Sequence, residues 1–334
     1  MSLPLGKIPM RVLRRILKHV VCGEDILVGP GIGIDAAVIR SSSSIIVSAC
    51  DPITGASRDV GWLSVHVNAN DIAVCAAYPR WYVVVLLMPP GTQEEHIYEL
   101  MSGIRGALSE IGASLVAGHT EITNKVTDTI VVGTMIGTPM ISGKYVSNRN
   151  ARPGDLIIMT KGAGIEGTWI LVDMFRRKLG LSESYARRAR GLRRLISVLP
   201  DVEALINIGI ENIHAMHDAT EGGLIGALFE LAEASNVGFY VDEECVIIRD
   251  ETRVLAEKLS LDPLKLISSG TLIAIVDPQH GDEAIDALSR RGIEASIIGR
   301  ITSGKRVLRR IDGTEVKIRD APVDELWRIL GEAK

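Results

Sequence analysis

An acidic residue, Asp71, stands at the head of a long apolar segment that runs to Met88. A carboxylate buried without a partner is costly, so an acid in such a segment needs a cation or strong hydrogen-bond donors nearby. Four further acids share this habit and lie beside glycine or at the end of an apolar stretch: Asp35, Asp51, Glu121 and Asp218. The fold must therefore place a cation or hydrogen-bond donors beside several carboxylates.

The composition narrows the class of protein. The chain has 334 residues, which suits two domains, and its 46% hydrophobic but only 4% aromatic content predicts an aliphatic core. A net charge of −4 argues against a nucleic-acid partner. The four cysteines form no CxxC pair, and the apolar run at 81–90 is too short to span a bilayer. We expect a cytoplasmic protein without a membrane or nucleic-acid partner.

Strand and helix patterns mix in both halves, which predicts an α+β chain of two layered domains. In the first half we expect a helix over 61–77 and a strand over 81–88 that is buried on both faces, because its residues do not alternate. In the second half a strand over 214–217 precedes a helix over 221–234. The turn-rich segment 145–155 places the boundary between domains 1–150 and 151–334.

A glycine-rich loop, 29–33, precedes Asp35. Gly31 and Gly33 would let backbone amides approach a phosphate, and Asp35 could hold a metal on it. The loop is not a P-loop, since no Gly-Lys-Ser/Thr follows, and an ordinary turn is the alternative.

Two more acids fall at places suited to a ligand. Asp51 ends a strand, although it could simply form a turn before Pro52. Asn70 and Asp71 lie on the helix over 61–77 beside small residues that admit a ligand, with a salt-bridged helical aspartate as the alternative.

Candidate catalytic residues follow two strands. His119 could act with Glu121, or be an ordinary surface histidine. Lys161, beside a glycine pair, could meet a substrate, or be a solvated loop lysine.

The segment 217–224 links a strand to a helix and carries Asp218, Thr220, Gly222 and Gly223. Free amides at a helix start bind anions. Helix capping by Asp218 or Thr220 is the alternative, and it is compatible with anion or metal binding.

If Asp35, Asp51, Asp71 and Asp218 converge, four negative groups share one cleft. Each like pair at ~4 Å would cost roughly 4 kcal/mol at an effective dielectric near 20, so the cluster requires cations. Oxygen ligands without a His/Cys set indicate Mg²⁺, which binds through carboxylates and substrate phosphates. The sequence thus predicts a site for Mg²⁺ and a nucleotide.

These motifs resemble the aminoimidazole ribonucleotide (AIR) synthase-like ATP-binding family, in which hydrogenase maturation factor HypE is the most similar branch. Asp71-x4-Ala76-Ala77-x-Pro79 resembles the D-x4-G-A-x-P signature, 33–37 resembles its G-D-D-A-A loop, and 218–224 resembles the D-P-T-R-G-G-L of HypE. The resemblance runs nearly end to end.

The resemblance implies a homodimer that binds Mg²⁺-ATP and activates an amide, acid or phosphate oxygen of a small substrate by phosphoryl transfer. The acids at 35, 51, 71 and 218 would hold Mg²⁺, with Gly31, Gly33, Asn70, Thr220, Gly222 and Gly223 around the nucleotide. His119, Glu121 and Lys161 are the candidate catalytic residues.

Three departures from the family pattern stand out. Ala76 replaces the signature glycine, and Ile34 replaces the first aspartate of the Gly-Asp-Asp loop. HypE carries its substrate group on a C-terminal cysteine, whereas the last cysteine here is Cys245. We therefore expect a free small-molecule substrate, with a non-catalytic nucleotide-binding partner of a maturation protein, or a kinase resembling thiamin-monophosphate kinase, as alternatives.

Overall fold

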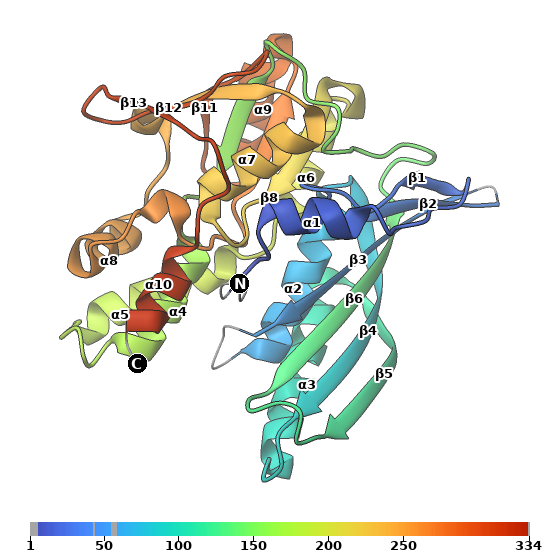
Figure 1. Ribbon diagram of the computed structural model, residues 1–334, viewed down its shortest axis with the longest axis vertical. Helices are drawn as coiled ribbons and strands as arrows, with labels where there is room; N and C mark the ends of the chain where they lie inside the picture. The colour runs from blue at the N-terminus through green and yellow to red at the C-terminus, as the bar shows by residue number, and fades with distance from the viewer. Residues whose placement is uncertain (1–5, 43, 55–58, 333–334) are drawn as a thin grey trace. The chain divides into compact units, whose positions relative to one another are not determined.

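The computed structural model describes residues 6–42, 44–54 and 59–332, which form two compact units (Figure 1). The sheet unit comprises Gly23–Gly29 and Asp35–Tyr145. The second unit, called the C-terminal unit below, comprises the chain up to Cys22, Pro30–Ile34 and the chain from Val146 onward. The change at 145–146 lies in the turn-rich segment, and two N-terminal pieces group with the C-terminal unit rather than with a continuous domain 1–150.

The sheet unit is one mixed sheet with two long helices, coloured blue to green in Figure 1. The strand order is β1-β2-β3-β6-β4-β5, and only the β4–β5 pair is parallel. Helix α2 packs on β3, β6 and β4, and α3 packs on α2. The elements are β1 (Ile26–Val28), β2 (Ala37–Ser41), β3 (Ser44–Ile53), α2 (Val60–Ala73), β4 (Ala77–Met88), α3 (Glu94–Ile111), β5 (Ser114–Ile122) and β6 (Ile130–Pro139).

Strand β4 corrects one sequence expectation. It is not buried on both faces: Tyr82, Val84 and Leu86 are buried, whereas the residues between them are half-buried. Trp81 is 42% exposed. Because successive side chains of a strand point to opposite faces, one face of the sheet is closed by helices and the other is an open apolar surface within this unit.

The C-terminal unit is built on a seven-stranded sheet of order β13-β12-β9-β11-β7-β10-β8. Its strands are β7 (Leu156–Thr160), β8 (Ile213–Asp218), β9 (Gly238–Asp242), β10 (Leu272–Val276), β11 (Ala295–Thr302), β12 (Arg306–Arg309) and β13 (Glu315–Lys317). Its helices are α1 (Met10–Leu17), α4 (Ile165–Phe175), α5 (Glu183–Gly191), α6 (Leu199–Leu205), α7 (Gly223–Ser235), α8 (Asp250–Leu259), α9 (Gly281–Arg290) and α10 (Glu325–Glu332).

Helices cover both faces of this second sheet. Ile157, Met159 and Ile273 form one buried cluster with Leu224 and Leu228 of α7. Gly281 of α9 packs against Leu156, whose side chain points to the other face because it precedes Ile157 by one residue. This burial on two faces explains why β10 is apolar throughout and buried at every position.

Several sequence expectations about local structure need correction. Helix α2 ends at Ala73 rather than at 77, because the chain turns at Ala76, which has φ +56°. Strand β1 and the helices α6 and α8 were not predicted; β1 is very short, and α8 has a charged surface that resembles a loop. Among the described helices, none combines the length and apolarity needed to cross a bilayer.

Candidate functional site

Asp51 lies near the end of β3 and is held there by a side chain of α2. Its amide donates to Asn68 Oδ1 over 2.9 Å, and Asn68 Nδ2 lies 3.2 Å from the carbonyl oxygen of Asp51. Asn68 Nδ2 also lies 2.8 Å from Ser64 O. Asn68 is fully buried. Its two hydrogen bonds to the backbone of Asp51 therefore fix the position from which the carboxylate side chain of Asp51 extends.

A glycine of the neighbouring strand makes room for this contact. Gly133 on β6 pairs with Asp51. A Cβ added at Gly133 would lie 2.4 Å from Tyr82 Oη and 2.6 Å from Asn68 Nδ2. Tyr82 in turn donates to Ser64 Oγ over 2.9 Å. The packing of β6 therefore admits only glycine at this position without a shift of Asn68 or Tyr82.

Asp71 lies on the same helix, three residues beyond Asn68, and is 4% exposed. Burial raises the pKa of the Cys75 thiol, and the charges of Asp35 and Asp71 raise it further. Both carboxylates therefore act on one buried thiol.

Three of the four predicted metal-binding acids belong to the sheet unit: Asp35, Asp51 and Asp71. The charges of Asp35 and Asp71 act on the same thiol, and the backbone of Asp51 is hydrogen-bonded to α2, the helix that carries Asp71. Asn70, also predicted, is fully buried on α2 beside Asp71. Of the two cysteines in this region, Cys50 is exposed and Cys75 is buried.

His119 and Glu121 lie elsewhere in the sheet unit. Both are on the edge strand β5, inside the strand rather than after it, and their side chains are 66% and 52% exposed. Their Nε2 and Oε2 atoms are 3.6 Å apart. Strands β6 and β4 separate β5 from β3, and three strand spacings of ~4.8 Å keep the pair about 14 Å from Asp51. The unit does not bring them together with the three acids.

Asp218 belongs to the C-terminal unit, where it ends β8 and is fully buried. Its charge acts on Lys161, at the end of β7. Strand β10 lies between these strands; Leu272 pairs with Asp218, and its amide donates to Thr160 Oγ1. Asp218 and Lys161 therefore meet at one end of this sheet. Convergence of Asp218 with the three acids of the sheet unit stays a prediction.

Lys161 is not a solvated loop lysine. It is 4% exposed, has φ +64°, and donates to Asp201 Oδ2 and Ser197 O, each over 2.8 Å. Burial lowers the pKa of Lys161, and the Asp201 carboxylate opposes that shift. The Lys161 ammonium is thus hydrogen-bonded to Asp201 of α6. Its positive charge also compensates the negative charge of Asp218 at the same end of the sheet.

The other face of β8 carries a chain of charged groups. His217 Nε2 lies 3.2 Å from Glu230 Oε2 on α7, and Lys7 Nζ lies 3.0 Å from Glu230 Oε1. The nearby Lys7 and His217 hold the pKa of Glu230 at about 2, against its desolvation. Gly33 packs on the same residue: with φ +67°, an added Cβ would lie 2.1 Å from Glu230 O. The predicted glycine-rich loop therefore requires glycine there for close packing on α7.

The glycine turn, Thr220–Gly223, leads into α7. Gly222 and Gly223 have φ +87° and +60°, and α7 begins without a side-chain cap, so the capping role considered for Asp218 or Thr220 is not observed. The amide of Gly222 donates to Asp324 Oδ2 over 2.6 Å, and that of Gly223 to Thr220 O. In this structure both amides have protein partners, and their contact with phosphates stays a prediction.

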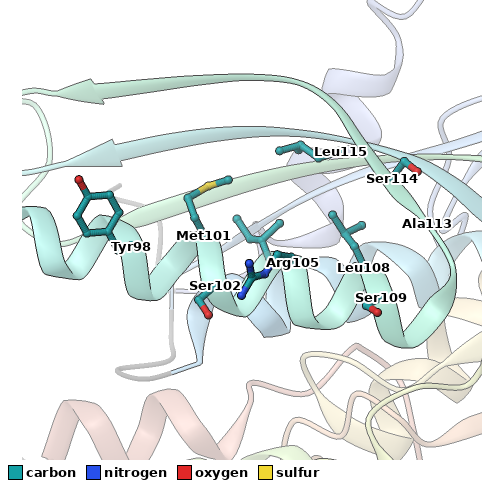
Figure 2. A pocket seen from close by; sticks show the side chains of 10 residues that line it. Tyr98, Met101, Ser102, Arg105, Leu108, Ser109, Ala113, Ser114 and Leu115 are labelled. Carbon is teal, nitrogen blue, oxygen red and sulfur yellow. The ribbon is translucent and has the colours of Figure 1, made fainter.

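A separate groove of about 690 Å³ lies between α3 and β5 in the sheet unit. Figure 2 shows Met101 and Leu108 of α3 beneath Leu115 of β5, with Tyr98 at one end. It contains none of the predicted site residues, and Arg105 is the cation in its lining.

Five buried polar residues that support these sites were missed. Asn68 could have been found, because an amide inside an apolar helix needs partners as a carboxylate does. For the others no local signal exists, since their partners come from distant segments: Glu166, Asp201, Glu230 and Asp324.

The family follows from comparison with known proteins. The family model "AIR synthase related protein, N-terminal domain" matches residues 33–139, and the corresponding C-terminal domain model matches 152–311. The chain belongs to the AIR synthase related family.

The curated relatives indicate a branch of that family. A Methanocaldococcus jannaschii protein named for hydrogenase expression and formation is 30% identical over 87% of this chain and 88% of its own. The carbamoyl dehydratase HypE of Azotobacter vinelandii is 28% identical over 80% of this chain and 75% of its own. The chain is thus HypE-like in sequence.

Solved structures share the fold. HypE in a complex with HypF matches with a TM-score of 0.77 and 22% identity, over 92% of this chain and 99% of that one. HypE in complex with ATP matches with a TM-score of 0.72 and 24% identity, over 97% and 98%. These likenesses confirm the expected two-domain α+β architecture of AIR synthase-like proteins.

Proposed function

We propose that this protein is a Mg²⁺-ATP-dependent enzyme of the HypE and AIR synthase type, which activates an amide, acid or phosphate oxygen of a small substrate by phosphoryl transfer. The relationship to carbamoyl dehydratases and the ATP complex of a HypE with the same fold support ATP-dependent chemistry. The observation that supports the proposal is the placement of these acids in the sheet unit: Asp35 and Asp71 act on the same buried thiol, and Asp51 is hydrogen-bonded to the helix that carries Asp71.

Asp35, Asp51 and Asp71 suit Mg²⁺ because they offer oxygen ligands alone. Asn68 fixes the backbone of Asp51, and the rigid, buried helix α2 fixes Asp71, so two of the acids are held before any ligand binds. Mg²⁺ bound there would neutralise phosphate charge. Because phosphoryl transfer depends on positioning and charge neutralisation, such a set supplies the chemistry the proposal needs.

The C-terminal unit would contribute Asp218 and the glycine turn. A helix leaves the amides of its first turn without intrahelical partners, which favours anions at the start of α7. Gly31, Gly33, Asn70 and Thr220 are proposed as nucleotide neighbours. Lys161 compensates charge at the sheet end through Asp201 and Asp218.

We further propose a homodimer formed through the open face of the first sheet. Trp81 lies there in a hollow of about 970 Å³ together with Ile45, Ile46 and Met140. The lining also contains Arg40 and several serines, and an exposed tryptophan within such a mixed apolar and polar surface suits contact with a second protein chain. His119 and Glu121 are kept as acid–base candidates, and a hydrogenase maturation protein is proposed as a further partner.

The test is nucleotide binding and turnover by the purified protein with Mg²⁺. Titration calorimetry measures ATP affinity, and ADP release is followed in a mixture of small amide, carboxylate and phosphate metabolites. Asp71→Asn and Asp51→Asn keep the shape of the side chain and remove its charge. Asp25→Asn, at an exposed position of the same unit, is the matched control.

We expect Mg²⁺-dependent binding that falls at least tenfold in Asp51→Asn and Asp71→Asn but not in Asp25→Asn, with turnover in the metabolite mixture. Binding without turnover in any mixture would favour a regulatory partner. ADP production stimulated by a single metabolite would identify a kinase. Equal ATP affinity with and without Mg²⁺ in all four proteins would refute the proposed site.

A further inference from the structure

The segment that follows Asp320 returns to the glycine turn through one buried carboxylate. Asp324 is 1% exposed. Its Oδ2 accepts from the amide of Gly222 over 2.6 Å, and its Oδ1 accepts from the amide of Leu326 over 2.8 Å at the start of α10. The backbone of Ile267, before β10, also hydrogen-bonds to it. One side chain thus joins three segments far apart in the sequence.

The glycine turn needs such an external tie. Gly222 and Gly223 both adopt positive φ, and glycine visits many other conformations at little cost. Gly223 is pressed against the loop before β10, since an added Cβ would lie 2.6 Å from Leu266 O and 2.9 Å from Leu264 O. Asp324 bonds both to the turn and to that loop, so it fixes the two backbones against each other.

The surroundings of Asp324 make its position costly. The pKa of Asp324 is raised to about 6. Burial is the largest cause and the neighbouring Glu221 adds to it, while the amides of Gly222, Leu326 and Ile267 favour the charged form and oppose the rise. A second buried acid lies close by: Glu166 on α4 accepts from the amide of Ser269 over 3.1 Å. Burying a carboxylate is unfavourable, so Asp324 contributes little stability through its burial. Its hydrogen bonds to the glycine turn, in contrast, are directional and specific.

We propose that Asp324 is a positioning residue that holds the glycine turn in the conformation used to bind the phosphates of the nucleotide. The inference rests on the proposed function for its binding consequence, but not for its effect on the turn. Asp324 is more than 100 residues away from the turn in sequence, and none of the sequence motifs includes it.

Two measurements test the proposal on the full-length protein. Hydrogen exchange followed by mass spectrometry reports the amides of the turn and of the first residues of α7, and calorimetry reports ATP affinity. Asp324→Ala removes both acceptors. Asp324→Asn keeps one acceptor oxygen, which can still cap α10. This variant replaces Asp324→Ala in the measurements if the alanine variant does not fold. Asp320→Asn, four residues earlier on an exposed position of the same segment, is the matched control.

We expect the peptide containing 222–225 to exchange at least tenfold faster in Asp324→Ala than in wild type, with core strands β7 and β10 unchanged. ATP affinity should fall about tenfold, with an intermediate loss in Asp324→Asn and none in Asp320→Asn. Unchanged exchange at the turn in a folded variant overturns the proposal, and so does an equal effect of Asp320→Asn. If wild type binds no ATP, the proposed function fails, while the exchange result still decides the role of Asp324.

Discussion

Lys161 and Asp201 form an ion pair that is almost completely enclosed, with Nζ 2.8 Å from Oδ2 and side-chain exposures of 5% and 1%. Each ion loses its hydration, and each is retained because the other compensates it. Asp218 acts on the same lysine, so the pair sets the charge balance at the end of the second sheet where a predicted metal-binding acid lies.

Breaking this pair on one side should be strongly destabilising. We expect Asp201→Ala to lower the free energy of unfolding by about 3–5 kcal/mol, because an uncompensated charge stays buried. The double variant Lys161→Met/Asp201→Leu should lose much less of the free energy of unfolding, because neither charge remains. Denaturant unfolding measures both. Glu203→Ala, which removes an exposed partner of Arg291, should cost under about 1 kcal/mol. Equal losses in the single and double variants would contradict this account.

Glu166 should make stability depend on pH. Burial raises its pKa from 4.5 to about 7, so the folded state keeps a proton that the unfolded chain releases. Stability contributed by the protonated form is present below pH ~4.5 and is lost as pH rises through 7. Glu166→Gln should remove this loss, which is at most about 3 kcal/mol at 1.36 kcal/mol per pKa unit.

Unfolding curves for wild type and Glu166→Gln between pH 4.5 and 8 test the assignment. The free energy of unfolding of Glu166→Gln should increase relative to that of wild type as the pH rises. Glu257→Gln, on an exposed position of α8, should follow wild type throughout. A wild-type curve that runs parallel to that of Glu166→Gln would show that Glu166 is not the titrating group.

Gly133 should tolerate no side chain. In Gly133→Ala the new methyl group meets Tyr82 and Asn68, and moving Asn68 releases Asp51. We expect a loss of about 1–3 kcal/mol in stability and weaker Mg²⁺-dependent ATP binding. Gly106→Ala, on α3 with open space around it, should instead gain up to about 1 kcal/mol. A Gly133→Ala protein with wild-type stability and binding would refute the packing argument.

Trp81 should matter for assembly. Trp81→Asp places a charge on the open face of the first sheet, which should shift a homodimer towards monomer. Sedimentation velocity at several concentrations measures this. Tyr98→Asp, on α3 at a position that is 67% exposed, should leave the oligomeric state unchanged. A wild-type protein that is monomeric at high concentration, or a dimer unaffected by Trp81→Asp, would rule out this interface.

Much of the architecture follows from the sequence because the elements depend on local patterns. The alternation of strands and helices, the apolar strand of β10 and the family motifs identify an AIR synthase-like chain of two units. The interpretation of β4 was wrong because an apolar run reports hydrophobicity, not which neighbours cover it. Helix α8 was missed because its residues pack less apolar surface than a typical buried helix.

The sequence by itself determined the kinds of residue at the site: acids beside glycines, in segments whose hydrophobicity forces those acids to have partners. Only the tertiary structure decided which partners these are. Asn68 holds Asp51, Asp201 occupies Lys161, and Asp324 ties the glycine turn to the C-terminal helix. The physical reason is that a buried polar group needs a partner in space, and the chain can supply it from any distance along the sequence.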